Sequence, residues 1–198
     1  MNQRQPIYTV GMTGASGAIY GVRLVQTLLK EGVKVHFLMS GAAWQVFEQE
    51  LELDVTDKEA CLHHLFPEGD LHVHGLQNFS APVASGSYQN DGMVIVPCSM
   101  GTLSKIANGN SGSLLERSAD VALKEGRKLV IVPRETPLHA IHLGNMKAVA
   151  EAGGVIIPAM PGFYHKPETL DDLVDFVVGK ILDRLDVEHH LFKRWGDD

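Results

Sequence analysis

The sequence YTVGMTGASGAIYGVRL, residues 8–24, places an apolar run directly before a cluster of Gly, Thr and Ser, and a helical pattern follows. This order is typical of a strand that ends in a glycine-rich turn and leads into a helix. Such a turn is a common phosphate site in α/β proteins, because backbone N–H groups and the helix dipole converge there. The stretch therefore raises the question of which phosphate it binds.

The rest of the chain repeats this alternation. Short β-branched runs predict strands at residues 7–12, 34–39, 93–97, 128–132 and 155–157. Longer segments between and after them predict helices at residues 18–30, 42–51, 102–107, 114–124, 138–150 and 170–186. Repeated βα units indicate an α/β protein with a parallel sheet. Residues 66–92, rich in Gly, Pro, Ser and Asn, remain without an assigned element.

Length and composition favour an ordinary globular protein. A chain of 198 residues suits a single domain, residues 1–198, with a core of its own. The net charge of −7 and the lack of a basic run argue against nucleic acid or membrane as a partner. No apolar run reaches the length of a membrane span, and no signal pattern is visible. Two cysteines without CxxC spacing predict neither a disulfide framework nor a zinc site, so a cytoplasmic location is expected.

The glycine-rich loop does not match the dinucleotide fingerprint. Gly11, Gly14, Gly17 and Gly21 are spaced as G-x-x-G-x-x-G-x-x-x-G rather than G-x-G-x-x-G. The second strand, KVHFLMS, also ends without an acidic residue for a ribose. Its last residue, Ser40, suits a mononucleotide or a flavin ring. A turn that only packs helix on strand remains an alternative for this loop taken alone.

A second cluster repeats the same design. In VIVPCSMGTLSKIANG, residues 94–109, a buried strand is followed by small polar residues that open a helix. Ser99 or Thr102 is expected either to cap that helix or to contact a ligand. Cys98 has neither a paired histidine nor a CxxC partner, which argues against thiol catalysis.

The third cluster, LVIVPRETPLHAIHLGNM at residues 129–146, carries charge. Thr136 is predicted as the N-cap of a helix, with Pro137 at its first position. Arg134 and Glu135 then project at the end of an apolar strand. They form either an ion pair with each other, or a phosphate-binding guanidinium beside a carboxylate suited to proton transfer.

The ten histidines invite a metal hypothesis, but their spacing does not support it. Six of them lie in polar surroundings and are expected to be solvated: His63, His64, His72, His74, His189 and His190. His139 and His142 are expected to share a helix face without a third ligand. His165, next to Tyr164, is the histidine retained as a pocket candidate.

Four stretches carry a resemblance to a known family: GASGAIYGVRL, PCSMGTLSKIANG, LVIVPRETPLH and MPGFYHKPETLDDLVDFVVGKILDRL. Together they resemble the UbiX/Pad1 family of flavin prenyltransferases, in the same order and over most of the chain, from about Val10 to Trp195. The resemblance implies a flavodoxin-like (Rossmann-like) fold, a three-layer open parallel sheet, in a homo-oligomer that is typically a dodecamer.

The same resemblance implies an activity. Such an enzyme transfers a dimethylallyl group from dimethylallyl phosphate to N5 and C6 of reduced FMN, without a metal. The prenylated FMN then serves as cofactor for UbiD-type decarboxylases, in ubiquinone synthesis or in the decarboxylation of aromatic acids.

The resemblance also implies residue roles. The residues expected to hold FMN are Gly14, Ala15, Ser16, Ser40, Ser99, Met100, Gly101, Thr102 and Arg134. Those expected to hold the prenyl phosphate are Tyr164, Lys180, Arg134 and Trp195. The catalytic set is expected to be Ser16, Glu50, Lys124 and Glu135. Many relatives have Lys at the position of Gly101 and Arg at that of Lys180, so these two contacts are expected to differ here.

Two other hypotheses are compatible with the motifs. Flavin-dependent peptidyl-cysteine or phosphopantothenoylcysteine decarboxylases share the fold, but they rely on a P-A-S-A-N-T-like loop where this chain has PCSMGTLSKIAN. A non-enzymatic flavin carrier would need the FMN loops but not Glu135, Tyr164 or Lys180.

Overall fold

One open parallel sheet organises the chain. The computed structural model describes residues 4–196, and within them six strands pair in the order β3-β2-β1-β4-β5-β6, each pair parallel. The strands are β1 (Ile7–Met12), β2 (Lys34–Met39), β3 (Leu71–His74), β4 (Gly92–Cys98), β5 (Lys128–Pro133) and β6 (Val155–Ile156). The central strands β1 and β4 are buried almost throughout, as expected of a sheet covered on both faces.

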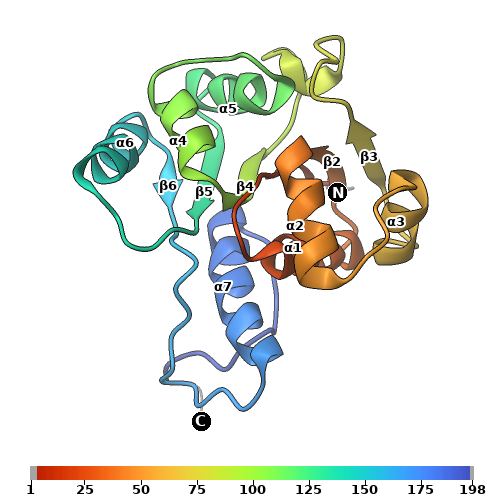
Figure 1. Ribbon diagram of the computed structural model, residues 1–198, viewed down its shortest axis with the longest axis vertical. Helices are drawn as coiled ribbons and strands as arrows, with labels where there is room; N and C mark the ends of the chain where they lie inside the picture. Colours follow the sequence, from red (N-terminus) through yellow and green to blue (C-terminus); the bar gives the residue numbers. More distant parts are fainter. Residues whose placement is uncertain (1–3, 197–198) are drawn as a thin grey trace.

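Helices cover both faces of this sheet (Figure 1). They are α1 (Ala18–Lys30), α2 (Gly41–Leu51), α3 (Lys58–Leu65), α4 (Met100–Ala107), α5 (Leu114–Lys124), α6 (Ala140–Glu151) and α7 (Leu170–Leu185), with a short 3-10 turn η1 (Pro82–Ala84). One core cluster unites the sheet with α1, α2, α3 and α7, and the other unites it with α4, α5 and α6. The expected three-layer α/β arrangement is therefore confirmed.

The predicted strands and the helices α1 and α5 are found close to the expected bounds, whereas residues 52–92 hold elements that the sequence pattern did not reveal. α3 has a weak apolar stripe, and β3 is only four residues long, with alternating histidines. Short edge strands carry little of the β-branched signal that marks central strands. The segment therefore looked like loop although it extends the sheet.

The start of α6 was predicted wrongly. Thr136 and Pro137 were expected to open the helix, but it begins at Ala140, and its N-cap is His139. The ring Nδ1 of His139 accepts a hydrogen bond from the backbone N–H of His142 at 3.4 Å, and the two rings stack. A histidine can therefore do the work of the Ser, Thr, Asp or Asn usually sought at this position.

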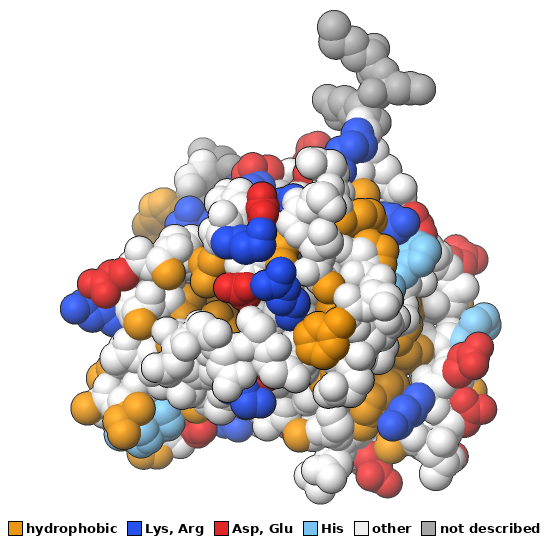
Figure 2. All heavy atoms as spheres, turned by 90° about the horizontal axis from the view of Figure 1, so that it is seen from above, with side chains coloured by type: hydrophobic (Ala, Val, Ile, Leu, Met, Phe, Trp, Pro, Cys, Tyr) orange, Lys and Arg blue, Asp and Glu red, His pale blue; other side chains and the backbone are white. Residues whose placement is uncertain are grey.

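The surface of the molecule mixes charges. In the view of Figure 2, Lys and Arg side chains lie beside Asp and Glu side chains, and hydrophobic side chains gather in patches between them. This face therefore offers no stripe of a single charge. None of the helices within residues 4–196 is both long and apolar enough to cross a membrane.

A chain of aromatic side chains joins β2 to the sheet edge. His36 is 2% exposed, and its ring nitrogens lie 2.8 Å from His74 Nε2 and 2.8 Å from the Tyr88 hydroxyl. Burial lowers the pKa of His36 to about 4, helped by the nearby charges of His74, Lys34 and His72 and opposed by Asp70. His36 is therefore neutral in the folded protein near neutral pH. His74 shares the buried pair, so it is less solvated than expected.

This burial predicts a pH-dependent stability. The unfolded chain protonates His36 near its ordinary pKa of 6.5 and the folded chain only near 4, so the unfolded state binds more protons between these values. The free energy of unfolding should therefore fall as pH drops through this window, by up to about 1.4 kcal/mol per pH unit from this residue. Urea titrations of the wild type and His36→Gln, at fixed protein concentration, measure the slope.

We expect His36→Gln to flatten the slope, because the amide does not titrate. The matched control is His64→Gln, which changes an exposed histidine of α3. Equal slopes in His36→Gln and the wild type would contradict the prediction.

Candidate functional site

The site lies where the strand order reverses. β1 is followed by β2 on one side, and β4 pairs with the other side of β1, so the loops after β1 and β4 diverge to opposite faces of the sheet. Crevices of this kind, at the carboxyl ends of parallel strands, are the usual ligand sites of open α/β sheets. GASG follows β1 here, and SMGT follows β4.

Thr13 ties these two loops together. Its hydroxyl donates to the Pro97 carbonyl at 3.0 Å and accepts from the Ser99 N–H at 2.7 Å, and its own N–H donates to the same carbonyl at 3.2 Å. Thr13 is 2% exposed, so these bonds form away from water. The sequence analysis assigned it no role, although a threonine directly after a buried strand was a usable signal for such a link.

Glycine is required in the first loop for reasons of space. A Cβ atom on Gly14 would lie 2.4 Å from Cβ of Ala42, in the first turn of α2. Gly17, the N-cap of α1, has φ of 104°, which side chains rarely adopt. The loop therefore lets α1 and α2 start close together beside β1.

A carboxylate occupies the N-terminus of α1. Glu50, near the end of α2, accepts hydrogen bonds from the N–H groups of Gly17 and Ala18, both at 2.9 Å to Oε2. Partial burial alone would raise the pKa of Glu50. Hydrogen bonds from the Ser16 hydroxyl and these N–H groups, together with the charge of Arg134, outweigh burial and leave that pKa below its ordinary value. The structure thus brings Ser16, Glu50 and Arg134 together.

The N-termini of α2 and α4 carry serine caps. Ser40 Oγ accepts from the Ala43 N–H at 3.1 Å at the start of α2, and Ser99 Oγ accepts from the Thr102 N–H at 3.3 Å at the start of α4. The first turn of a helix leaves further N–H groups without intrahelical partners. At α4 these belong to Met100 and Gly101, and nothing lies within 4 Å of a Cβ placed on Gly101.

Arg134 and Glu135 do not pair with each other among the described residues. Nε of Arg134 is buried and has no hydrogen-bond partner there. Glu135 is exposed, and its Oε1 accepts from the Thr136 N–H at 3.0 Å. The ion-pair alternative is therefore not observed. Arg134 keeps an unsatisfied donor at the site, which is costly unless a ligand provides the acceptor.

Cys98 is a structural residue. It is fully buried, its thiol donates to the Ser99 carbonyl at 3.4 Å, and burial raises the pKa of the thiol far above its ordinary value. Nucleophilic cysteines need a depressed pKa and access to solvent. The expectation against thiol catalysis is thus supported by the surroundings of Cys98.

The residues expected to hold the prenyl phosphate form a second group. Tyr164 is 47% exposed and Trp195 is 82% exposed, and their ring centroids are 5.4 Å apart. Lys180, on α7, lines a hollow beside β6 with Phe176. Within residues 4–196, no described hydrogen bond, ion pair or ring contact links these three residues to Ser16, Glu50 or Arg134. His165 stacks on Phe176 with centroids 5.1 Å apart.

Lys124 lies apart from both groups. It is the last residue of α5. This helix leads to the start of β5, so Lys124 lies at the amino ends of the strands, whereas the site lies at their carboxyl ends. Its ammonium group pairs with the neighbouring Glu125. The structure of one chain therefore does not bring Lys124 to the other predicted catalytic residues.

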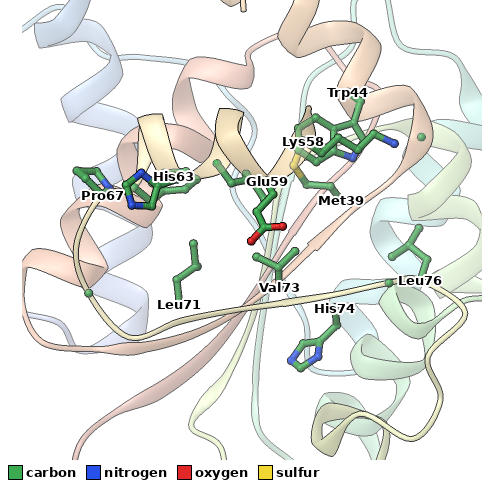
Figure 3. Close-up of a pocket in the computed structure, with 15 residues that line it drawn as sticks. Met39, Trp44, Lys58, Glu59, His63, Pro67, Leu71, Val73, His74 and Leu76 are labelled. Carbon is green, nitrogen blue, oxygen red and sulfur yellow. The ribbon is translucent and has the colours of Figure 1, made fainter. Parts of the chain in front are cut away.

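A hollow of about 850 Å³ lies beside the site without containing it (Figure 3). It lies between α2, α3 and β3, with Met39 and Trp44 at one end and Pro67 at the other, and the Glu59 carboxylate points toward Val73. Met39 and Gly41, the two neighbours of Ser40, line it, but none of the predicted site residues does. The hollow and the predicted site residues are therefore two separate places among the described residues.

Comparison with known proteins places the chain in a family. The family model described as Flavoprotein matches residues 1–182. A protein of Alkalihalophilus pseudofirmus named flavin prenyltransferase UbiX is 61% identical over 200 residues, which cover 100% of both chains.

Solved structures agree with this match. A structure described as AnUbiX (PadA1) in complex with FMN and dimethylallyl pyrophosphate is 42% identical, with a TM-score of 0.90 over 98% of both chains. A dodecameric FMN-dependent UbiX-like decarboxylase of Escherichia coli O157:H7 is 44% identical, with a TM-score of 0.87 over 96% of this chain and 98% of that one. With likeness of this extent, the chain belongs to the UbiX family of flavin prenyltransferases.

Proposed function

We propose that this chain is a flavin prenyltransferase, which transfers a dimethylallyl group from dimethylallyl phosphate to reduced FMN. The observation that carries the proposal is the buried, unpartnered Nε of Arg134, which lies beside the Ser16–Glu50 pair at the carboxyl edge of the sheet. The relative named flavin prenyltransferase UbiX, 61% identical over the whole chain, supports the same activity. Residues 1–198 then act as one FMN-binding domain.

The residues at the site fit a flavin mononucleotide. The N–H groups of Met100 and Gly101 at the positive end of α4 suit its phosphate, since the first turn of a helix attracts anions. The N-terminus of α1 is less suited, because the Glu50 carboxylate already neutralises it. We therefore assign the phosphate to the loop after β4, and the flavin ring to Gly14, Ala15 and Ser16.

When bound, reduced FMN supplies two nucleophilic atoms, N5 and C6. N5 would bond to the carbon that carries the phosphate, while the C–O bond breaks and the leaving phosphate takes the electron pair. C6 would bond to the far carbon of the allylic double bond, and a proton would add to the carbon between. N5 and C6 each lose one proton, so the site needs groups that accept and return protons and groups that stabilise the phosphate.

Ser16, Glu50 and Glu135 are the residues proposed for the proton transfers. The Ser16 hydroxyl donates to Glu50, a carboxylate whose lowered pKa keeps it ionised and able to hold that hydroxyl in place. Glu135 has one oxygen fixed by the Thr136 N–H, which leaves the other free to take a proton from the flavin. Arg134 is the residue proposed to stabilise the leaving phosphate, because its guanidinium group offers hydrogen-bond donors to an oxyanion.

The second group, Tyr164, Lys180 and Trp195, then binds the prenyl phosphate and covers the prenyl chain. Because it is exposed and makes no described contact with the first group, we infer that copies of the chain complete each other's sites in a homo-oligomer. The solved relative described as dodecameric supports this assembly. A role for Lys124 at the site would likewise require a second copy. The metal-independent reaction needs no further ligand set.

The product, prenylated FMN, has no use on this protein, so a UbiD-type decarboxylase is the proposed recipient. Cys61 and Cys98 are both free and buried, which suits the reducing cytoplasm. A flavin carrier would not need Glu135 or the aromatic pair, and a cysteine decarboxylase would not use a prenyl phosphate. The flavin product distinguishes these alternatives.

Product analysis tests the reaction directly. The protein is incubated without oxygen with reduced FMN and dimethylallyl phosphate, and the released flavin is weighed by mass spectrometry. A gain of one C5H8 unit is expected. Unchanged FMN, with the diphosphate donor tried as well, would reject the proposed activity.

Glu135→Gln tests proton transfer. The amide oxygen can still accept from the Thr136 N–H, so the loop should keep its shape. We expect kcat to fall by about a hundredfold, the scale of a lost general base, with the affinity for FMN unchanged. Loss of FMN binding instead would make Glu135 a structural residue.

Gly14→Ala tests the packing of the first loop. The added methyl group meets Ala42 at 2.4 Å, so α2 must shift, and we expect stability to fall by about 1–3 kcal/mol and FMN to bind more weakly. Gly41→Ala is the control, because a Cβ there meets nothing within 4 Å. Thermal unfolding and flavin fluorescence titration measure both effects; equal behaviour of the two variants would refute the packing argument.

A further inference from the structure

The chain after α7 turns back and packs along that helix. In Figure 1 this segment runs beside α7 from the sheet toward the C-terminus. The contact is close at Gly179, where a Cβ atom would lie 2.4 Å from Phe192 and 2.7 Å from His189. His189 is 7% exposed, so the expectation that it is solvated was wrong. We call residues 187–196 the return segment.

Asp183 is the centre of the polar contacts that hold the return segment. Its carboxylate accepts from Arg194 at 2.7 Å and 3.2 Å, and from His189 Nε2 at 3.1 Å. Nδ1 of His189 accepts from the Leu191 N–H at 3.3 Å, which leaves the proton on Nε2, facing Asp183. Arg194 also lies over the ring of Phe192, with the guanidinium carbon 5.6 Å from the centroid.

The same carboxylate faces the proposed substrate group. Lys180 Nζ lies 3.7 Å from Asp183 Oδ2, one helical turn away on α7. Trp195 follows Arg194 directly and packs edge-on against Tyr164. Asp183 therefore touches Lys180 on one side and, through Arg194, anchors the backbone that carries Trp195.

The hydrogen bonds from Arg194 hold the pKa of Asp183 below its ordinary value despite partial burial, and the hydrogen bond from His189 adds to this effect. The carboxylate is thus charged near neutral pH. The contact to Lys180 is the longest of the three and the least directional. Lys180 can therefore turn toward an incoming phosphate while Arg194 and His189 keep Asp183 compensated.

We propose that Asp183 is a positioning residue for the prenyl phosphate: it fixes the return segment, and with it Trp195, and restrains Lys180 at the surface that receives the substrate. This inference rests on the proposed function, and it adds a residue that contacts neither flavin nor phosphate. The substrate it serves is an allylic phosphate monoester or diphosphate.

The test compares Asp183→Asn with Asp175→Asn. Asp175 lies on the same helix and also binds an arginine in two places, Arg23 at 2.6 and 2.9 Å, but it does not touch the return segment. Both variants lose an Arg–carboxylate pair, so both should lower the thermal midpoint. Only Asp183→Asn should raise KM for dimethylallyl phosphate, by about tenfold, with the affinity for FMN unchanged.

A second readout follows the return segment itself. Trypsin cleavage after Lys193 or Arg194, timed by mass spectrometry, should be faster in Asp183→Asn than in the wild type and unchanged in Asp175→Asn. Arg194→Met removes the other partner of this ion pair. Because the Arg194 side chain is half-exposed, the variant should fold, and its KM for dimethylallyl phosphate should rise as in Asp183→Asn. Cleavage after Lys193 can still be timed in this variant.

The outcomes are distinct. A wild-type protein that makes no prenylated flavin overturns the proposed function. If the wild type makes prenylated flavin and Asp183→Asn has the same KM for dimethylallyl phosphate, the positioning role is overturned, even if trypsin cleaves the variant faster. Unchanged cleavage in Asp183→Asn and Arg194→Met overturns the anchoring of the segment.

Discussion

The hydroxyl group of Thr13 holds together the two loops on which the site is built. It donates to the carbonyl of Pro97 in β4 and accepts from the N–H of Ser99 in the loop after β4, at the point where the strand order reverses. A valine would have the same shape but would leave the Ser99 N–H without its acceptor in a buried place, at a cost of about 1–3 kcal/mol, while the Pro97 carbonyl would keep only the bond from the backbone N–H of residue 13. This side chain therefore links the two loops, in addition to the pairing of β1 with β4.

The electrostatics of the site follow from the same crowding. The helices α1, α2 and α4 begin at the carboxyl ends of the strands that they follow, and each brings a partial positive charge. Glu50 cancels that of α1 and orients Ser16, while α4 and Arg134 keep their donors. The opening glycine-rich stretch, which resembles a phosphate loop, thus has its helix N-terminus filled by the protein's own carboxylate. This stretch is therefore better suited to contact a ligand ring than to bind an anion.

The sequence predicted the central sheet well, because buried strands such as β4 and β5 each contain the β-branched run Val-Ile-Val. It also placed the small polar residues at the strand ends, since parallel strands bring these ends together. It missed β3 and α3, whose short and polar patterns depend on contacts across the sheet edge. It missed His139 as a helix cap for the same reason, because the bond that defines a cap is visible only in three dimensions. The roles of Asp183 and His189 come from a segment that turns back over residues already passed, and no local pattern encodes such a return.

Gly179 makes the residues that can occupy α7 depend on the residues of the return segment that pack against it. A residue larger than glycine would push His189 and Phe192 away from α7, and a smaller side chain at position 192 would leave a gap beside Gly179 that a side chain at 179 could fill. We therefore expect substitutions at these positions to be tolerated better in combination than singly. Among relatives, substitutions at position 179 and in the segment that covers it should therefore occur together.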